Sequence, residues 1–314
     1  MSTLYIDRKE LEIRLDGKSL ALYCSNKRQS TVPLGILDRL IITGNNITLS
    51  SNVIATLASL GIAVIILAGR HQQKIASIWG TPHNDASIRL GQYYLSQDKN
   101  TCLNQSRHII RSKFIHQLDF IKSVKIKRKD LRKPLSDFIK QINHYIQRLE
   151  ETTSIDSLLG LEGASASSYF TAYKSIFPPA LSFTNRNRRP PRDPINSILS
   201  FSYTLLHYEA VQNIYKTGLD PYIGFYHQPS FGRESLACDL IEPLRPICDK
   251  FTYDLFRSST LRIDHFSIDE DKCLLTKTGR AYFYKAWEEQ NPVIRRYPRL
   301  SCRNLAKYIK SESK

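Results

Sequence analysis

The chain has 314 residues, which exceeds the usual size of a single hydrophobic core and predicts two domains. Hydrophobic residues make up 41% of it, a share that is ample for packed cores and argues against gross disorder. The formal net charge of +16 favours a polyanionic partner, with nucleic acid as the commonest and an anionic membrane surface as the rival.

The cysteines and the N-terminus indicate the compartment. None of the six cysteines belongs to a C-x-x-C pair or a metal-finger spacing, which favours reduced thiols. The N-terminus enters directly into an alternating strand pattern, with no signal-peptide pattern before it. The longest apolar run, residues 62–68, is too short to span a bilayer. We therefore predict a soluble cytoplasmic protein.

Residues 4–78 are mostly strand-like. Apolar and polar residues alternate on both sides of Asp16-Gly17, a strong signal for a hairpin turn. Residues 49–60 have helical spacing, and the continuous apolar run that follows them is typical of a fully buried strand. This pattern predicts a small β-rich N-terminal domain over residues 1–80.

The remainder, residues 81–314, shows apolar spacing near 3.6 with few breakers. Helices are predicted at residues 88–95, 102–124, 131–149, 155–177, 195–215, 235–256 and 277–289. A hairpin is predicted within residues 266–275, and a basic tail after the last helix. The predicted fold class is α+β with two domains, in which the larger, all-α C-terminal domain carries a metal site.

The metal site is predicted from residues 224–246. His227 lies in a loop punctuated by glycine and proline, and Asp239 and Glu242 stand three apart on the helix that follows, hence on one face. Pro243 has no N–H and is expected to leave the carbonyl of Asp239 without its helical partner. Each signal alone has a plainer explanation, because Glu242 can pair with Arg245 and a lone histidine is often structural.

A further carboxylate, Glu162, is the only acid in the run L-L-G-L-E-G-A-S-A-S-S-Y-F. A buried carboxylate is expensive, so it should bind a metal or form an ion pair with one of the arginines. With His227 these residues offer one nitrogen and two or three oxygen ligands, a set that favours Mg²⁺ or Mn²⁺. The H-E-x-x-H helix of zinc hydrolases is absent. The candidate catalytic residues are Glu162, His227, Asp239 and Glu242.

Basic clusters predict contact with a phosphate backbone. The run R-N-R-R-P-P-R at residues 186–192 holds four arginines, and prolines keep it extended; its plainer explanation is a solvated linker. Residues 122–133 hold seven basic side chains and one acid, a run that is often only a solvated face. The residues predicted to contact DNA are Tyr169, Arg186, Arg188, Arg189, Arg192, Tyr203, Arg233 and Arg245.

Two stripes of polar or small residues can each be interpreted either as part of a ligand site or as a contact between helices. Ser165 and Tyr169 share the face of Glu162, where small residues let a helix or a ligand approach closely. Asn196, Ser200 and Tyr203 line one side of the helix that Asp193 can cap, and that stripe is equally well an internal hydrogen-bond seam.

Three ordered motifs, at residues 158–170, 188–203 and 227–246, resemble the CRISPR-associated spacer-acquisition integrases, which are metal-dependent DNA endonuclease–integrases. The resemblance extends from L-Y-I-D near the N-terminus to about Tyr284. It implies that Glu162, His227 and Glu242 are metal ligands and that Asp239 lines the site, as a ligand or behind one. The basic run at residues 122–133 matches no part of the family pattern.

The resemblance also implies partners and a reaction. Family members dimerise through the β-rich domain, work with a small ferredoxin-like partner, and insert short DNA duplexes into a repeat array. In that reaction a 3′-hydroxyl attacks a phosphodiester. The alternative is a non-catalytic DNA-binding scaffold with a structural ion pair at the predicted metal site. A phosphodiesterase for small nucleotides is disfavoured because it would not need extended basic clusters.

Overall fold

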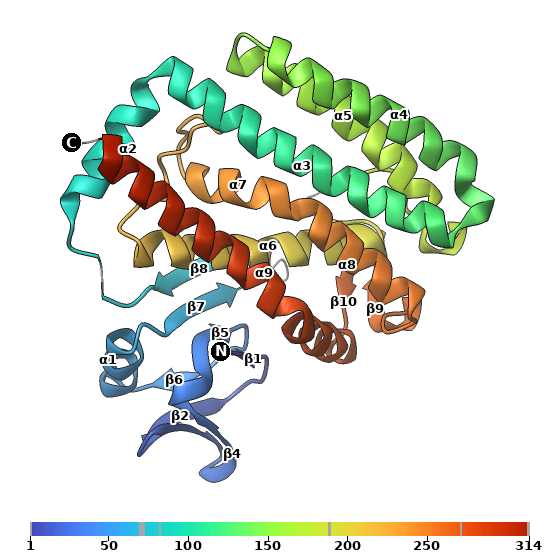
Figure 1. Cartoon of the computed structure of the whole chain (residues 1–314). Coiled ribbons are helices and arrows are strands. Elements are labelled where there is room, and N and C mark those ends of the chain that lie inside the picture. The colour runs from blue at the N-terminus through green and yellow to red at the C-terminus, as the bar shows by residue number, and fades with distance from the viewer. Residues whose placement is uncertain (1, 69–72, 82, 188–189, 271, 313–314) are drawn as a thin grey trace. The chain divides into compact units, whose positions relative to one another are not determined.

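The computed structural model describes residues 2–68, 73–81, 83–187, 190–270 and 272–312 (Figure 1). The chain forms two compact units, residues 1–84 and residues 85–314. The division falls four residues after the boundary that the sequence predicts. The first unit is rich in strands and the second is helical apart from one short hairpin, so the predicted fold class is confirmed.

Within its described residues, the first unit contains two sheets of four strands each. One has the order β1-β5-β7-β8, with β8 antiparallel to β7 and the other neighbours parallel; the other has the order β4-β3-β2-β6. The elements are β1 (Ser2–Ile6), β2 (Leu11–Asp16), β3 (Ser19–Cys24), β4 (Lys27–Pro33), η1 (Leu34–Ile36), β5 (Leu37–Ile42), β6 (Thr48–Leu49), α1 (Ser51–Ser59), β7 (Ala63–Ala68) and β8 (Gln73–Ile78).

Local sequence explains this unit. Gly17 and Lys18 form the turn that joins β2 to β3 directly after Asp16, and Gly17 has the positive φ of +56° that such a turn requires. Ser50 caps α1, since its side chain accepts a hydrogen bond from the N–H of Val53. Leu11 and Ile13 alternate with polar neighbours along β2 and enter one core. The predicted hairpin and helix are therefore confirmed.

The second unit contains the helices that position the site. Its elements are α2 (Ala86–Gln97), α3 (Lys99–Lys127), η2 (Lys129–Leu131), α4 (Arg132–Arg148), η3 (Leu149–Glu151), α5 (Ile155–Ser175), η4 (Pro179–Leu181), α6 (Pro194–Lys216), α7 (Ser235–Ile241), η5 (Glu242–Leu244), α8 (Arg245–Arg257), η6 (Ile263–His265), β9 (Phe266–Ile268), β10 (Cys273–Leu275) and α9 (Lys277–Glu312). Helices α3, α4 and α5 lie side by side, and α9 crosses α2, α6 and α7 (Figure 1).

The prediction of one continuous helix over residues 235–256 is wrong, because the helix is interrupted at η5. Pro243 and Pro246 are the second residues of η5 and α8, in the first turn, where a missing N–H costs little because it has no partner within the helix. The carbonyl of Asp239 also keeps a partner, since it accepts a hydrogen bond from the N–H of Glu242. The chain thus tightens into a 3₁₀ turn at the residue that was predicted to bind a metal.

The predicted basic tail is also a helix. Helix α9 continues to Glu312, more than twenty residues beyond its predicted end. The reason is an apolar stripe that packs inward, while most of the basic residues face outward and Arg295 is paired with the buried Glu209. Its buried members are Ile294, Cys302, Ala306 and Ile309. None of the described helices has the length and apolarity needed to cross a membrane.

Candidate metal centre

The loop that carries His227 is built on the carboxylate of Asp239. This carboxylate is buried and accepts hydrogen bonds from the backbone N–H groups of Phe225 (2.7 Å), Tyr226 (3.0 Å) and His227 (2.9 Å). At the other end of the loop, Nε2 of His207 lies 2.6 Å from the carboxylate of Glu234. Buried side chains therefore fix both ends of the loop.

Gly224 begins this loop because a side chain would not fit there. An added Cβ would lie 2.7 Å from the carbonyl oxygen of His227 and 2.9 Å from Oδ2 of Asp239. Both distances are shorter than real Cβ contacts allow, and the first of these atoms belongs to the backbone. The glycine therefore lets the backbone fold over Asp239.

Asp239 also orients the imidazole of His227. Its Oδ1 lies 2.7 Å from Nδ1 of that ring, and because a carboxylate only accepts, Nδ1 carries the proton and donates a hydrogen bond to Asp239. Nε2 then has no hydrogen-bond partner among the described residues and is the nitrogen that can bind a cation or accept a proton. Asp239 therefore lies on the Nδ1 side of the ring, opposite the nitrogen that could bind a cation.

Glu162 and Glu242 meet at one ammonium group. Nζ of Lys113, on α3, lies 2.5 Å from Oε1 of Glu162 and 2.7 Å from Oε2 of Glu242. Oε1 of Glu242 accepts a further bond of 2.8 Å from Nε of Arg245. Both plainer explanations are thus partly observed: Glu242 pairs with Arg245, and Glu162 pairs with a lysine rather than an arginine.

Electrostatics keep Glu242 and Lys113 ionised. Burial acts to raise the pKa of Glu242, but Arg245 and Lys113 together lower it to about 2. Burial likewise acts to lower the pKa of Lys113, and the charges of Glu242 and Glu162 raise it above its ordinary value. The pKa of Tyr226 is raised, first by burial and then by the charges of Glu162 and Glu242. The loop that carries His227 therefore lies beside the two carboxylates.

The donor set fits a divalent cation in its chemistry. Two carboxylates already converge on one positive charge, and an imidazole with a free nitrogen lies on the neighbouring loop, which suits Mg²⁺ or Mn²⁺. The hydroxyl of Tyr226 is buried beside them and has no hydrogen-bond partner among the residues that the structure describes. In the described part of the chain, no three His, Cys, Asp or Glu side chains are gathered closely enough to hold a metal ion. Lys113 stands between two of the donors.

A second buried carboxylate, Asp249, joins α8 to the helices behind the site. It accepts hydrogen bonds from the hydroxyls of Tyr169 (2.8 Å) and Tyr203, and its carbonyl accepts one from Tyr173 (2.9 Å). Burial raises its pKa to about 6, against the opposing effect of the tyrosine bonds and of two arginines. Tyr169 has no exposed surface, so in this conformation it offers DNA no contact.

The arginines predicted to contact DNA have different surroundings. Arg186 donates to Oδ1 of Asn196 (2.8 Å) and Oγ of Ser200 (3.1 Å), and its guanidinium stands 5.5 Å from the ring centre of Tyr203. The stripe on α6 is thus an internal hydrogen-bond seam. The guanidinium of Arg245 lies over the same ring, at 4.7 Å.

Only part of the arginine-rich loop is described. Arg188 and Arg189 lie outside the described residues. Arg192 is exposed. Arg233, on the loop after His227, is half-buried and bonds the carbonyl of Gln228. Arg192 is therefore the described arginine of this group that is most open to a ligand.

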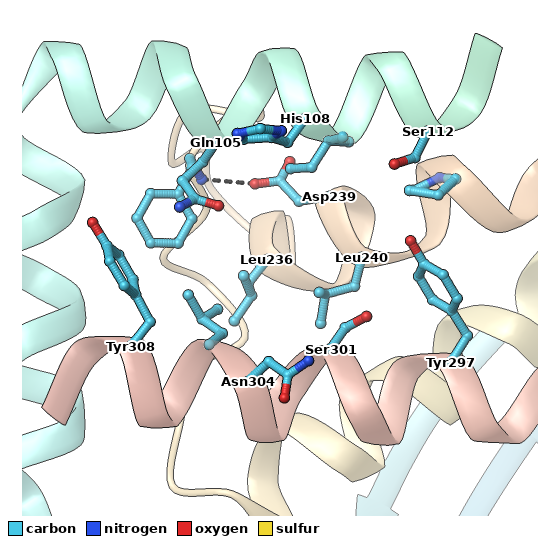
Figure 2. A pocket seen from close by; sticks show the side chains of 14 residues that line it. Gln105, His108, Ser112, Leu236, Asp239, Leu240, Tyr297, Ser301, Asn304 and Tyr308 are labelled. Carbon is cyan, nitrogen blue, oxygen red and sulfur yellow. Dashed lines mark hydrogen bonds between the residues drawn. The ribbon is translucent and has the colours of Figure 1, made fainter. Parts of the chain in front are cut away.

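A groove of about 330 Å³ lies between α3, α7 and α9 (Figure 2). Asp239 and Leu236 of α7 form part of its wall, and Tyr297 and Tyr308 of α9 face them. One of the hydrogen bonds to Asp239, from Phe225, is drawn there. The lining residues do not include Glu162, His227 or Glu242, so this groove is not the chemical site.

Fold and site together define a class of protein. It is an α+β protein of two units, and its helical unit places a histidine beside two carboxylates that both bond the ammonium group of Lys113. The family model described as "CRISPR associated protein Cas1" matches residues 4–289. The chain therefore belongs to the Cas1 family, and the resemblance found in the sequence is confirmed.

Individual comparisons agree. The chain is 43% identical over 293 residues to "CRISPR-associated endonuclease Cas1 1" of Thermodesulfovibrio yellowstonii, covering 92% of this chain and 91% of that one. Its fold is similar to that of a Cas1 protein from Thermotoga maritima, with a TM-score of 0.84 at 21% identity over 98% and 97% of the two chains. It is also similar to a casposase bound to integration product, with a TM-score of 0.82 at 23% identity over 98% and 91%.

Two residues of the site were missed by sequence reasoning. Lys113 lies on the buried stripe of α3 with Ile110, Phe114 and Gln117. A lysine on such a stripe is a signal in itself, because a buried ammonium needs a carboxylate partner. Asp249 gave a similar signal, as an acid on the buried face of α8.

Proposed function

We propose that this protein is a metal-dependent DNA integrase and endonuclease that inserts short DNA into a CRISPR repeat array. The proposal rests on one observation in a chain of the Cas1 family. Glu162 and Glu242 both bond the ammonium group of Lys113, beside a histidine that Asp239 orients. Membership of that family and the structural similarity to a casposase support DNA as the substrate.

The residues would divide the work of a transesterification, in which a 3′-hydroxyl attacks a phosphodiester. A bound Mg²⁺ or Mn²⁺ would supply a Lewis acid at the phosphate. Glu162, Glu242 and Nε2 of His227 would hold that ion. Asp239 keeps His227 in the tautomer whose Nε2 is free, and Arg245 offsets the charge of Glu242.

Partners follow from the family and from the charge. We propose a homodimer formed through the β-rich unit, a small ferredoxin-like adaptation protein as partner, and double-stranded DNA as the ligand. The net charge of +16 supports the last of these. Size-exclusion chromatography with multi-angle light scattering, of the protein alone and with its partner, would test the assembly, and a monomer at micromolar concentration would contradict the dimer.

Strand transfer tests the reaction. A short duplex with free 3′-hydroxyls is incubated with a supercoiled plasmid that carries a repeat, together with the partner and Mn²⁺, Mg²⁺ or EDTA. His227→Ala is expected to lose at least about a hundredfold in joined product, because the oriented nitrogen is gone. His144→Ala, an exposed histidine on α4, is the matched control and should keep wild-type activity. Wild-type activity of His227→Ala would contradict the site.

A second candidate is favoured by one observation, the ion-pair cluster itself. Lys113, Glu162, Glu242 and Arg245 form a complete set of partners without a metal, as a structural core of a non-catalytic DNA-binding scaffold would. In a scaffold, Glu242→Gln would lower thermal stability and leave DNA binding as the only activity. The wild type is assayed with the correct repeat and partner. If it shows no metal-dependent cleavage or joining of DNA, the result favours this candidate.

A further inference from the structure

Lys113 occupies the centre of the site, between the two carboxylates. Its side chain is 10% exposed, that of Glu242 is 7% exposed, and both oxygens that it binds lie within 2.7 Å of its ammonium. Two bonds of this length and burial fix the ammonium group where a cation ligated by both carboxylates would have to be.

The charges of the cluster already cancel. Lys113 and Arg245 carry two positive charges, and Glu162 and Glu242 carry two negative ones. A divalent cation that joined these four residues would add two positive charges, of which the buried carboxylate of Asp239, behind His227, offsets one. One positive charge would then remain in excess in a largely buried site, which is unfavourable. With the ammonium of Lys113 withdrawn, the excess falls to zero.

A path for the ammonium exists. Glu162 keeps 21% of its side chain exposed, so the cluster borders solvent on the side of α5. Lys113 reaches the carboxylates through four methylene groups, whose rotation moves the ammonium without moving α3. Arg245 has no such freedom, because its guanidinium also lies 4.7 Å from the ring centre of Tyr203.

We propose that Lys113 is an internal counter-ion that holds the place of the metal and that a divalent cation must displace its ammonium group in order to bind. The inference rests on the proposed function, since it concerns the same site. In the metal-free protein, Lys113 keeps the carboxylates of the buried Glu242 and the half-buried Glu162 from facing each other without a cation between them. In the loaded protein, the displaced ammonium is a free cation beside the phosphate-binding position.

Removal of the lysine should therefore strengthen metal binding. Free Mn²⁺ is measured by electron paramagnetic resonance during titration of the wild type, of Lys113→Met and of the control Lys250→Met. Lys250 also forms a lysine–carboxylate pair, but an exposed one, with Asp254 on α8. Lys113→Met is expected to bind Mn²⁺ at least tenfold more tightly than the wild type, and Lys250→Met equally tightly. Equal or weaker binding by Lys113→Met would overturn the inference.

The wild type provides a second measurement that does not depend on how a variant folds. Lysines are acetylated briefly with acetic anhydride, in EDTA or in saturating Mn²⁺, and quantified by peptide mass spectrometry. Lys113 is expected to be protected in EDTA and to react at least threefold faster with Mn²⁺ bound, while Lys250 reacts equally in both. An unchanged rate at Lys113 in protein that has bound Mn²⁺ would overturn the inference alone. Failure of every protein to bind Mn²⁺ would overturn the metal of the proposed function as well.

Discussion

Two buried aspartates do different work in the second unit. Asp239 accepts hydrogen bonds from three backbone N–H groups and from the ring of His227, so it shapes a loop and sets a tautomer. Asp249 accepts bonds from two tyrosine hydroxyls and holds α8 against α5 and α6. The first is saturated with donors, whereas the second is buried among neutral groups, with two arginines nearby.

Asp249 makes the stability of the fold depend on pH. Its pKa is raised to about 6 in the folded protein, from an ordinary value of 3.8. The folded state therefore favours the protonated acid, and the contribution of Asp249 to stability is full below pH 3.8 and lost as pH rises through 6. The loss at pH 8 amounts to about 3 kcal/mol, at 1.36 kcal/mol per pKa unit.

Urea unfolding at pH 4 to 8 measures this loss. The free energy of unfolding of the wild type, relative to that of Asp249→Asn, should fall by about 3 kcal/mol across the window, because asparagine does not titrate. The window of Glu242 lies lower, because its pKa falls from 4.5 to about 2 in the folded protein, so its stabilisation is full above pH 4.5 and is lost as pH falls from there through 2. Asp254→Asn, on the exposed face of α8, is the control. A difference that stays constant with pH would contradict the prediction.

For individual residues, the sequence predicts which side chains belong to the site better than it predicts which side chains they contact. The isolated Glu162 in a small, apolar run predicts a buried carboxylate that must be paired, and in the structure this side chain is half-buried and paired with Lys113. Its partner lies 49 positions away on another helix, and spacing within one helix carries no information about that choice. Asp239 and Glu242 are three apart, yet one binds the loop of His227 and the other binds Lys113. A shared face brings two side chains near each other but does not give them one ligand.

Elements are predicted well where one signal dominates. The apolar spacing of α3, α4, α5 and α6 is long and regular, and each predicted helix agrees with the structure to within a few residues. The prediction fails at α7, because two prolines lie in an otherwise helical pattern. It also fails in the second half of α9, where Pro298 and many basic residues conceal an apolar stripe of wide spacing.

The thiol of Cys302 tests the helical tail. This residue has no exposed surface, and burial raises the pKa of its thiol to about 12. A thiol with that pKa has a small thiolate fraction near neutral pH, and burial further limits access to it. We expect iodoacetamide to alkylate Cys302 at least about a hundredfold more slowly than the half-buried Cys24, as followed by peptide mass spectrometry. Equal rates at the two cysteines would mean that the basic tail is not packed as α9.

At the scale of the whole molecule, composition indicates a polyanionic partner but not where that partner binds. A net charge of +16 is spread over both units and concentrated in runs such as residues 122–133 and 186–192. The first run lies at the end of α3 and the start of α4, with most of its basic side chains exposed. Part of the second is used inside the fold, since Arg186 bonds Asn196 and Ser200. A count of charges cannot separate these two uses.

DNA affinity should therefore depend steeply on salt, because phosphate contacts release counterions. Each contact contributes a slope of about 0.9 to the fall of log K with log salt concentration. Replacement of Arg188 and Arg189 together by alanine should lower that slope by about 2 and weaken binding to all sequences alike, as measured by fluorescence anisotropy at 50 to 200 mM NaCl. The double variant Lys250→Ala, Lys272→Ala removes the same charge from lysines that pair with Asp254 and Asp269, and its slope should stay that of the wild type. Equal slopes for both double variants would place the phosphate contacts elsewhere, and a salt-independent affinity would refute the polyanion argument that the composition supports.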